Sequence, residues 1–405
     1  MSVAPKVRFL DRTTPPHLFT LVLMAGVSAM NMSIFLPSLP AMTVEFDTTY
    51  AVMQLSVSMY LAFTALVQIF AGPLADRFGR RPVMLWALLI FVLATIGCLL
   101  STTIELFLFF RMVQSTVAVA MVLSRAIVRD IVPEKESAAM IGYVTMGMSL
   151  VPMMAPAVGG FLQGAFGWQA TFIFLIAFGL ALGALCWADQ GETNRDGGMS
   201  FAAQVSEYPE LFTSRRFWGY AMAATFSTGA FFAFLGGAPY VATHVFELDP
   251  TRTGFLFGVP PVGYFFGNYL SGRYSVRLGV NRMILAGTLI LVFGMTGSLI
   301  VSYAGYGSAI MFFGFCTFVG LGNGMVLPNA TAGLLAVRPH LAGTASGVGG
   351  AVMIGGGAAL SQLAGVALTA GEGSYPLQWI MLGSVLMSLI CILYVMRREV
   401  TIADT

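Results

Sequence analysis

The chain has 405 residues, of which 57% are hydrophobic and 9% are charged, and its mean hydropathy is +0.83. A water-soluble domain carries about 25% charged residues, so this composition excludes a soluble protein and leaves no length for a soluble catalytic domain. The formal net charge is +2 and the basic residues are dispersed over loops, which argues against nucleic-acid binding.

Long apolar stretches predict twelve transmembrane helices, because each is long enough to cross a bilayer, which takes ~20 mostly apolar residues. The first follows Lys6, Arg8 and Arg12 but is too long for a cleaved signal, so we expect a retained span. The predicted fold class is an all-α membrane protein embedded in the lipid bilayer. The predicted bounds lie near 18–40, 50–72, 83–102, 105–128, 138–163, 169–188, 217–241, 254–275, 283–303, 307–335, 343–370 and 377–396.

The spans form two groups of six, separated by the polar run DQGETNRDGG that begins at Asp189. We predict an N-terminal half at residues 1–188, a cytoplasmic linker at 189–216 and a C-terminal half at 217–405. The segments GPLADRFGRRP and GRYSVRLGVNR, which begin at Gly72 and Gly272, share Gly, Arg and Gly at an offset of 200 residues. A repeat of six spans is typical of transporters, whose binding cavity lies between the halves near the bilayer midplane.

Basic residues gather on one side of the predicted membrane, except for Arg111 and Arg252. Positive charge is retained on the cytoplasmic side, so we expect a multi-pass protein of a bacterial inner membrane with both termini in the cytoplasm. The four cysteines lie in apolar stretches, and the three histidines are scattered without metal-ligand spacing. No metal site and no cofactor are therefore expected.

The loop between the second and third spans resembles the signature loop of the major facilitator superfamily, so the resemblance implies the major facilitator fold. Helix-dipole physics predicts that its aspartate docks at the N-terminus of the eleventh span, near residues 341–344. The resemblance also implies an ion pair between Arg80 and Asp130; the alternative is a solvated surface pair worth 0 to about 1 kcal/mol. The loop and this acid are the predicted gating residues: Gly72, Asp76, Arg77, Gly79, Arg80, Arg81 and Asp130.

The fifth span contains GMSLVPMMAPAVGG, which resembles the motif of the exporting branches of this superfamily. Proline removes a helix hydrogen bond and glycine allows close backbone approach, so the span is expected to bend and slide against a neighbour at Pro152, Pro156, Gly159 and Gly160. FLPSLP, from Phe35 to Pro40, and SRAIVRD, which ends at Asp130, resemble the bicyclomycin and chloramphenicol resistance subfamily of drug/proton antiporters. This resemblance implies a monomeric multidrug and antibiotic resistance transporter, with protons as the coupling ion.

The sequence departs from that subfamily in the first span, where many members carry an acid. Ser33 occupies the matching position, Asn31 precedes it, and every Asp and Glu lies at a membrane edge or in a loop. A cavity without a carboxylate should favour neutral, amphipathic or weakly anionic compounds over lipophilic cations. Proton coupling would then use an edge carboxylate such as Asp130, or act through Arg111.

Arg111 and Gln114 in RMVQS resemble the Arg and Gln of the family's fourth span, although Ser115 replaces the usual glycine. An arginine at the centre of a membrane helix costs ~2.5–3.5 kcal/mol, so Arg111 needs a cavity or a polar partner. Either it couples protons or substrate to transport, or it snorkels toward a structural partner such as Glu105.

Polar and aromatic residues at mid-span depth are the predicted substrate-cavity residues, because amide and phenol groups there need hydrogen-bond partners that a solute can supply. The alternatives are interhelical hydrogen bonds for the asparagines and lipid-facing packing for the phenylalanines. The set comprises Asn31, Ser33, Phe35, Tyr60, Arg111, Gln114, Phe231, Phe234, Tyr264, Asn268 and Asn323.

The predicted function is secondary active export of a small neutral or amphipathic compound by alternating access. An importer or metabolite exchanger of the same fold is the neighbouring alternative. A multispan enzyme would need clustered catalytic groups near one interface, which the sequence lacks. A transport-inactive sensor is disfavoured because few residues follow the last span.

Overall fold

The computed structural model describes residues 7–131, 144, 151–193, 208–338, 342–370 and 373–403, and the described elements are helices. The first group is α1 (Leu18–Ser33), the 3-10 turn η1 (Leu36–Ser38), α2 (Leu39–Glu45), α3 (Tyr50–Met53), α4 (Leu55–Phe78), α5 (Arg80–Leu100), α6 (Ile104–Val113), the 3-10 turn η2 (Gln114–Val117), α7 (Ala118–Ile131), α9 (Val151–Phe166) and α10 (Gln169–Asp189). The second group is α12 (Tyr208–Phe212), α13 (Arg215–Tyr240), the π-helical turn η3 (Val241–Val245), α14 (Pro250–Phe257), α15 (Val259–Leu278), α16 (Val280–Val301), the π-helical turn η4 (Ser302–Tyr306), α17 (Ala309–Ala336), α18 (Ala342–Ala370) and α19 (Tyr375–Ala403).

Ten helical segments of the described chain are long and apolar enough to cross a membrane. The predicted fifth span falls partly outside the described residues, and α9 is its described part. The predicted eighth span is present as α14 and α15, and α15 carries Arg277 in its last turn. Together with the fifth and eighth spans, the ten helical segments account for the twelve predicted spans.

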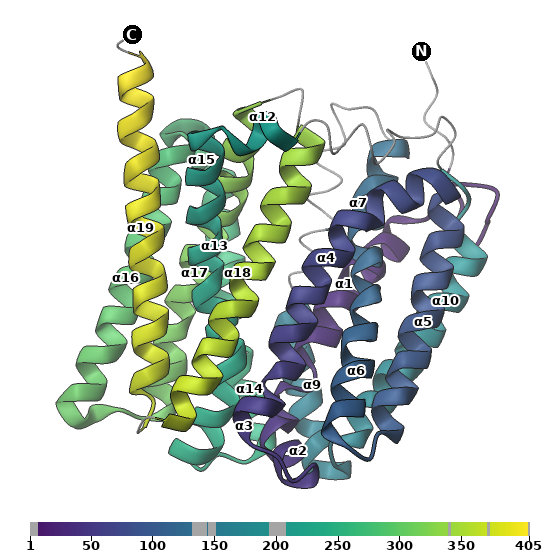
Figure 1. Ribbon diagram of the computed structural model, residues 1–405, viewed down its shortest axis with the longest axis horizontal. Helices are drawn as coiled ribbons and strands as arrows, with labels where there is room; N and C mark the ends of the chain where they lie inside the picture. The colour runs from purple at the N-terminus through teal and green to yellow at the C-terminus, as the bar shows by residue number, and fades with distance from the viewer. Residues whose placement is uncertain are drawn as a thin grey trace.

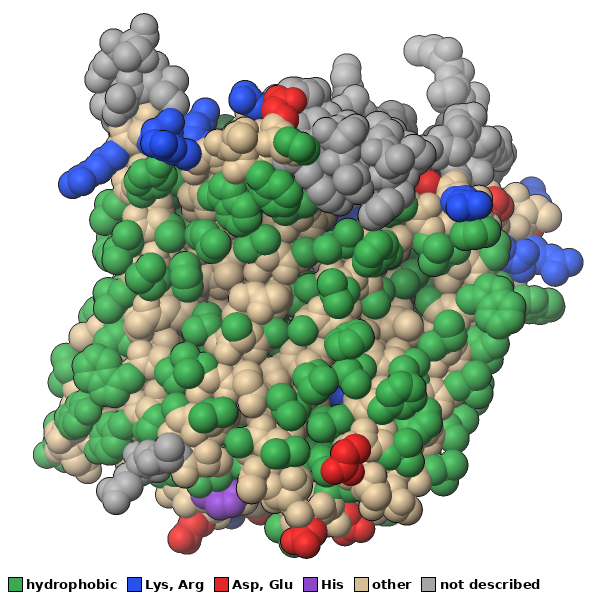
Figure 2. Space-filling view, viewed as in Figure 1, with side chains coloured by type: hydrophobic (Ala, Val, Ile, Leu, Met, Phe, Trp, Pro, Cys, Tyr) green, Lys and Arg blue, Asp and Glu red, His purple; other side chains and the backbone are tan. Residues whose placement is uncertain are grey.

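The helices stand side by side in two bundles, α1 to α10 and α13 to α19 (Figure 1). Apolar side chains cover the flanks, and charged side chains gather at the two ends of the view in Figure 2. We call the end with Arg80 and Arg216, at the starts of α5 and α13, the basic end. The opposite end, with Glu105 and Asp249 at the starts of α6 and α14, is the acidic end.

The two bundles repeat each other at their basic-end turns. Gly79 has φ 94° and ψ 150° between α4 and α5, and Gly279 has φ 83° and ψ 156° between α15 and α16. A positive φ is accessible to glycine at little cost, which explains why both copies of the loop keep this residue.

Each bundle also joins its last helix to its first through a carboxylate. Asp189, the final residue of α10, accepts hydrogen bonds from the His17 amide (2.8 Å) and the Thr20 hydroxyl (2.6 Å) at the start of α1. Glu399 near the end of α19 pairs with Arg216 and accepts a 3.0 Å hydrogen bond from the Tyr220 hydroxyl at the start of α13. The anion at each helix N-terminus is electrostatically favourable.

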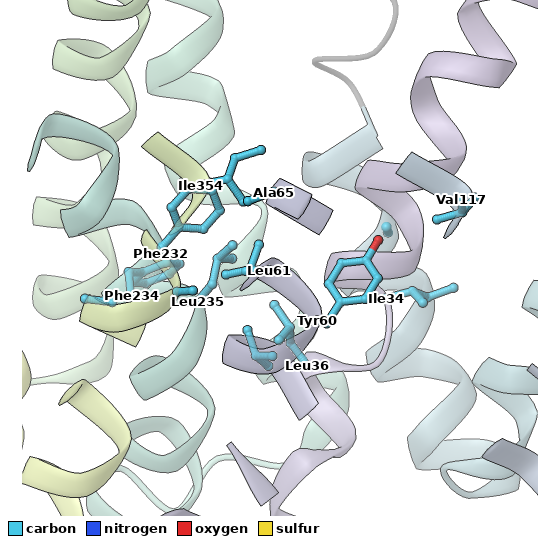
Figure 3. Packing of buried hydrophobic residues seen from close by; sticks show 14 of the residues in the cluster. Ile34, Leu36, Tyr60, Leu61, Ala65, Val117, Phe232, Phe234, Leu235 and Ile354 are labelled. Atoms are coloured by element: carbon cyan, nitrogen blue, oxygen red, sulfur yellow. The ribbon is translucent and has the colours of Figure 1, made fainter. Parts of the chain in front are cut away.

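One contact between the bundles runs along α4. Figure 3 shows Leu61 and Ala65 of α4 among the apolar side chains Phe232 and Leu235 of α13 and Ile354 of α18. Tyr60 lies on the other side of α4, inside the first bundle (Figure 3). This placement makes α4 the wall between the first bundle's interior and the bundle interface.

Candidate functional site

Arg111 lies inside the first bundle and is 1% exposed. Its Nε donates to the Ser56 carbonyl (3.2 Å), and its Nη2 donates to the Asn31 carbonyl (2.9 Å). Its Nη1 donates both to Asn31 Oδ1 (2.9 Å) and to Gln114 Oε1 (2.5 Å). These contacts tie α1, α4 and the α6–η2 junction to one cation.

Aromatic rings cover the guanidinium of Arg111. Its central carbon lies 4.2 Å from the ring centre of Phe35 and 4.4 Å from that of Tyr60. Each ring contributes a cation–π attraction, which strengthens when the cation is desolvated. We call this group the arginine cage: Asn31, Phe35, Ser56, Tyr60, Arg111 and Gln114.

The cage partners settle the structural role of Arg111. Its hydrogen bonds go to neutral oxygens, and among the described residues no carboxylate pairs with it. The snorkelling alternative with Glu105 is therefore wrong. Ser33, at the position of the family acid, donates to the Ala29 carbonyl of its own helix at 2.8 Å and makes no such contact.

The predicted cavity residues of the second bundle do not join the cage. Asn323 Oδ1 accepts from Ser227 at 2.7 Å, and Asn268 Nδ2 donates to the Tyr264 carbonyl at 2.8 Å. Phe234 packs against Phe257 and Phe313 with ring centres 5.0 and 5.8 Å away, and the half-buried Phe231 stacks on Phe234. Asn323 thus matches the interhelical alternative, whereas Asn268 bonds within its own helix and Phe234 is buried among aromatic rings rather than facing lipid.

The predicted gating residues form a charged cluster at the basic end. Asp76 Oδ1 lies 2.5 Å from Arg80 Nη1, and Arg80 Nε donates to Asp130 Oδ2 at 3.1 Å. The Arg80 side chain is only 10% exposed, so this is not the solvated surface pair considered above. The predicted docking site for Asp76 includes residue 341, outside the described residues, and the side chains of 342–344 are not described either.

Sequence reasoning missed the contribution of the linker to this cluster. Glu192 accepts from the backbone amides of Arg80 (2.9 Å) and Arg81 (3.2 Å), which are the first two of α5. The Thr193 hydroxyl donates to Asp130 Oδ2 at 3.1 Å. A carboxylate at a helix N-terminus satisfies free N–H groups and meets the positive end of the helix dipole.

The remaining loop residues lie outside the ion-pair cluster and make separate contacts. Arg81 Nη2 donates to the Trp187 carbonyl (2.9 Å), which closes α10 against the loop. Arg77 lies over the ring of its neighbour Phe78 at 5.3 Å. A Cβ added at Gly72 would meet nothing within 4 Å, so space does not explain this glycine.

The acidic end joins the bundles through neutral polar side chains. The Tyr50 hydroxyl donates to the Gly236 carbonyl (2.8 Å), and Gln54 Nε2 donates to Ser361 Oγ (2.8 Å). The Ser58 hydroxyl donates to Gln362 Oε1 at 2.7 Å. We call these six residues the polar latch.

The glycines of the predicted fifth span make a second contact at the acidic end. A Cβ added at Gly159 would lie 1.6 Å from the Ile34 carbonyl oxygen, which is a contact within the first bundle. One at Gly160 would lie 2.3 Å from the Pro250 carbonyl oxygen in the second bundle. A Cβ at Gly254 of α14 would likewise lie 2.4 Å from the carbonyl oxygen of Pro156. Only glycine permits this backbone contact between α9 and α14. The side chain of Pro152 lies outside the described part.

Two helical bundles, joined at one end by uncharged contacts and carrying a charged cluster at the other, define the class of a membrane transporter. The Major Facilitator Superfamily model matches residues 21–362, and the chain belongs to this family. It is therefore a multi-pass membrane transporter rather than an enzyme.

Curated relatives cover most of the chain. It is 28% identical over 376 residues to Multidrug resistance protein D of Escherichia coli, covering 90% of this chain and 92% of the relative. It is 25% identical to the Bicyclomycin resistance protein homolog of Haemophilus influenzae, covering 87% and 89%. It is 29% identical to a Chloramphenicol resistance protein of Pseudomonas aeruginosa, covering 80% and 77%.

Solved structures share the fold. The D-xylose–proton symporter aligns with a TM-score of 0.77 at 15% identity, covering 93% of this chain and 96% of that one. A bacterial homolog of the human lysosomal transporter Spinster, in an inward-facing occupied conformation, aligns with a TM-score of 0.72 at 17% identity, covering 94% and 96%. At these identities the likeness concerns the fold alone.

Proposed function

We propose that the chain exports small neutral or amphipathic compounds from the cytoplasm across a bacterial inner membrane. The observation that carries this proposal is a buried first-bundle site, the arginine cage, that holds a cation and no carboxylate. A lipophilic cation entering such a site would meet uncompensated positive charge in a medium of low dielectric. The relatives named for drug, bicyclomycin and chloramphenicol resistance support export of compounds of this kind.

Alternating access between two halves is the proposed mechanism. We take the halves as residues 1–188 and 217–405, joined by the linker 189–216, and place the basic end and both termini in the cytoplasm because positive charge is retained there. The polar latch and the glycine contact between α9 and α14 then close the outer side. On this orientation the outer side is closed, and cargo would enter between the halves from the cytoplasmic side.

Switching requires the outer contacts to separate while the inner ones form. The latch consists of neutral hydrogen bonds worth about 0.5–1.5 kcal/mol each, so a modest difference in binding energy between two states can open it. The cluster of Asp76, Arg80 and Asp130 serves as the inner gate in this scheme. We propose protons as the coupling ion, Asp130 as the carboxylate that carries them, and a monomer as the working unit.

Reconstitution in proteoliposomes tests the proposal. We expect a neutral phenicol to be exported when a pH gradient is imposed, and a cationic dye to be exported poorly. Asp130→Asn should remove the dependence on the gradient while leaving phenicol exchange in its absence. Efficient export of the dye without export of the phenicol would contradict the proposal.

A further inference from the structure

We infer that the arginine cage recognises the carboxylate group of an organic monoanion. This inference rests on the proposed function, and it adds organic monoanions to the neutral and amphipathic compounds proposed above, as ligands of the arginine cage inside the first bundle. It begins from a charge imbalance: Arg111 is a buried cation whose four hydrogen bonds all end on neutral oxygens. Neutral partners only partly offset the free energy of desolvating a buried cation, and an anion would offset more of it.

The acceptors at one edge of the guanidinium occupy the place of a carboxylate. Nη1 contacts Asn31 Oδ1 and Gln114 Oε1, and the neighbouring Nη2 contacts the Asn31 carbonyl. A carboxylate binds such an edge with two parallel hydrogen bonds, which are stronger than bonds to amide oxygens. The side-chain oxygen of Asn31 therefore occupies a position where a carboxylate oxygen would bind Arg111 more strongly.

The surroundings of this edge suit a planar anion. The Phe35 and Tyr60 rings lie within 4.4 Å of the guanidinium carbon, and an aromatic lining of this kind suits the apolar part of an organic anion. Two donors in the cage residues have no hydrogen-bond partner in the part of the chain that the structure describes, although their residues are fully buried: Asn31 Nδ2 and Ser56 Oγ. Rotation of the Asn31 amide would withdraw its oxygen from Arg111 and turn its N–H groups toward an incoming carboxylate.

Binding of benzoate, with benzamide as its uncharged analogue, tests the assignment on the purified full-length protein. We expect benzoate to bind at least about tenfold more tightly than benzamide, because only the carboxylate completes the pair with Arg111. Asn31→Asp supplies a carboxylate from the chain itself, so benzoate affinity should fall about tenfold or more. Asn31→Ala removes the competing amide oxygen together with its N–H donors and adds no charge, so benzoate affinity should fall clearly less than in Asn31→Asp.

The two substitutions at Asn31 thus separate a charge effect from general damage. If Asn31→Asp does not fold, Gln114→Glu places a carboxylate on the other contact of Nη1 and gives the same test. Equal binding of benzoate and benzamide, or an equal loss of benzoate binding in both Asn31 variants, would overturn the inference. Phenicol export by the same preparation reports on the proposed function separately, so failure of one does not imply failure of the other.

Discussion

At the scale of single residues, the sequence placed Arg111 and Gln114 on one helix face but not beside Asn31. Helical periodicity identifies which residues share a face, whereas the contact with Asn31 joins positions 80 residues apart. The amide of Asn31 and the carbonyl of Ser56 carry no sequence signal that marks them as partners of an arginine. The ion pair of Arg80 with Asp130 could be anticipated because it belongs to a recognisable motif.

Removing the side-chain acceptor of Asn31 should destabilise the first bundle. Asn31→Leu preserves approximate size but takes one oxygen from buried Arg111, so we expect a loss of about 1–3 kcal/mol in the free energy of unfolding. Ser33→Ala is the matched control, since its hydroxyl bonds only to its own helix, and should change stability by less than about 0.5 kcal/mol. Thermal unfolding in detergent measures both; equal effects would argue against the cage as a stabilising unit.

The linker residue Glu192 should stabilise the fold through its negative charge. Glu192→Gln keeps the shape but removes the anion from the start of α5, so we expect a stability loss of about 0.3–1 kcal/mol at low salt. The difference between the variant and the native chain should shrink as salt is added, because the site is exposed to screening. A difference independent of salt would show that the interaction is not electrostatic.

At the scale of elements, the prolines and glycines of the predicted fifth span indicated a helix able to approach a neighbour closely. The sequence did not identify the neighbour, which is α14, because a stripe of small residues fits many partners. No sequence pattern predicted the polar latch. Tyr50, Gln54 and Ser58 are ordinary polar residues near helix starts. Only the packing of the two bundles gives them partners, in α13 for Tyr50 and in α18 for Gln54 and Ser58.

A side chain at Gly160 should force α9 away from α14. Gly160→Val adds atoms where the Pro250 carbonyl already lies, and overpacking of this kind costs about 1–3 kcal/mol. Under the proposed orientation this contact helps to close the outer side, so we expect increased labelling of a cysteine at position 54 from that side and roughly tenfold slower phenicol export. Gly183→Val in α10 is the control, since a Cβ there meets nothing within 4 Å and should leave both readouts unchanged.

At the scale of the whole molecule, composition and span count predicted a multi-pass membrane protein, and the resemblance of the loop after the second span predicted the family, which is confirmed. The spans can be predicted because the bilayer restricts spanning segments to regular helices, which hydropathy identifies. The conformational state cannot be predicted from hydropathy, since both states of a transporter share one sequence and one set of helices. Which end is closed follows only from contacts such as the latch.

The central claim is that export requires the outer contacts of the two halves to open. The test uses Ser58→Cys with Gln362→Cys in a chain whose native cysteines are replaced by alanine, joined by a short reducible thiol reagent across the latch. Tyr303→Cys with Trp379→Cys, a contact within the second half, is the matched control. We predict that cross-linking the latch pair stops phenicol export, that reduction restores it, and that cross-linking the control pair changes little. Continued export by fully cross-linked latch protein would contradict the account.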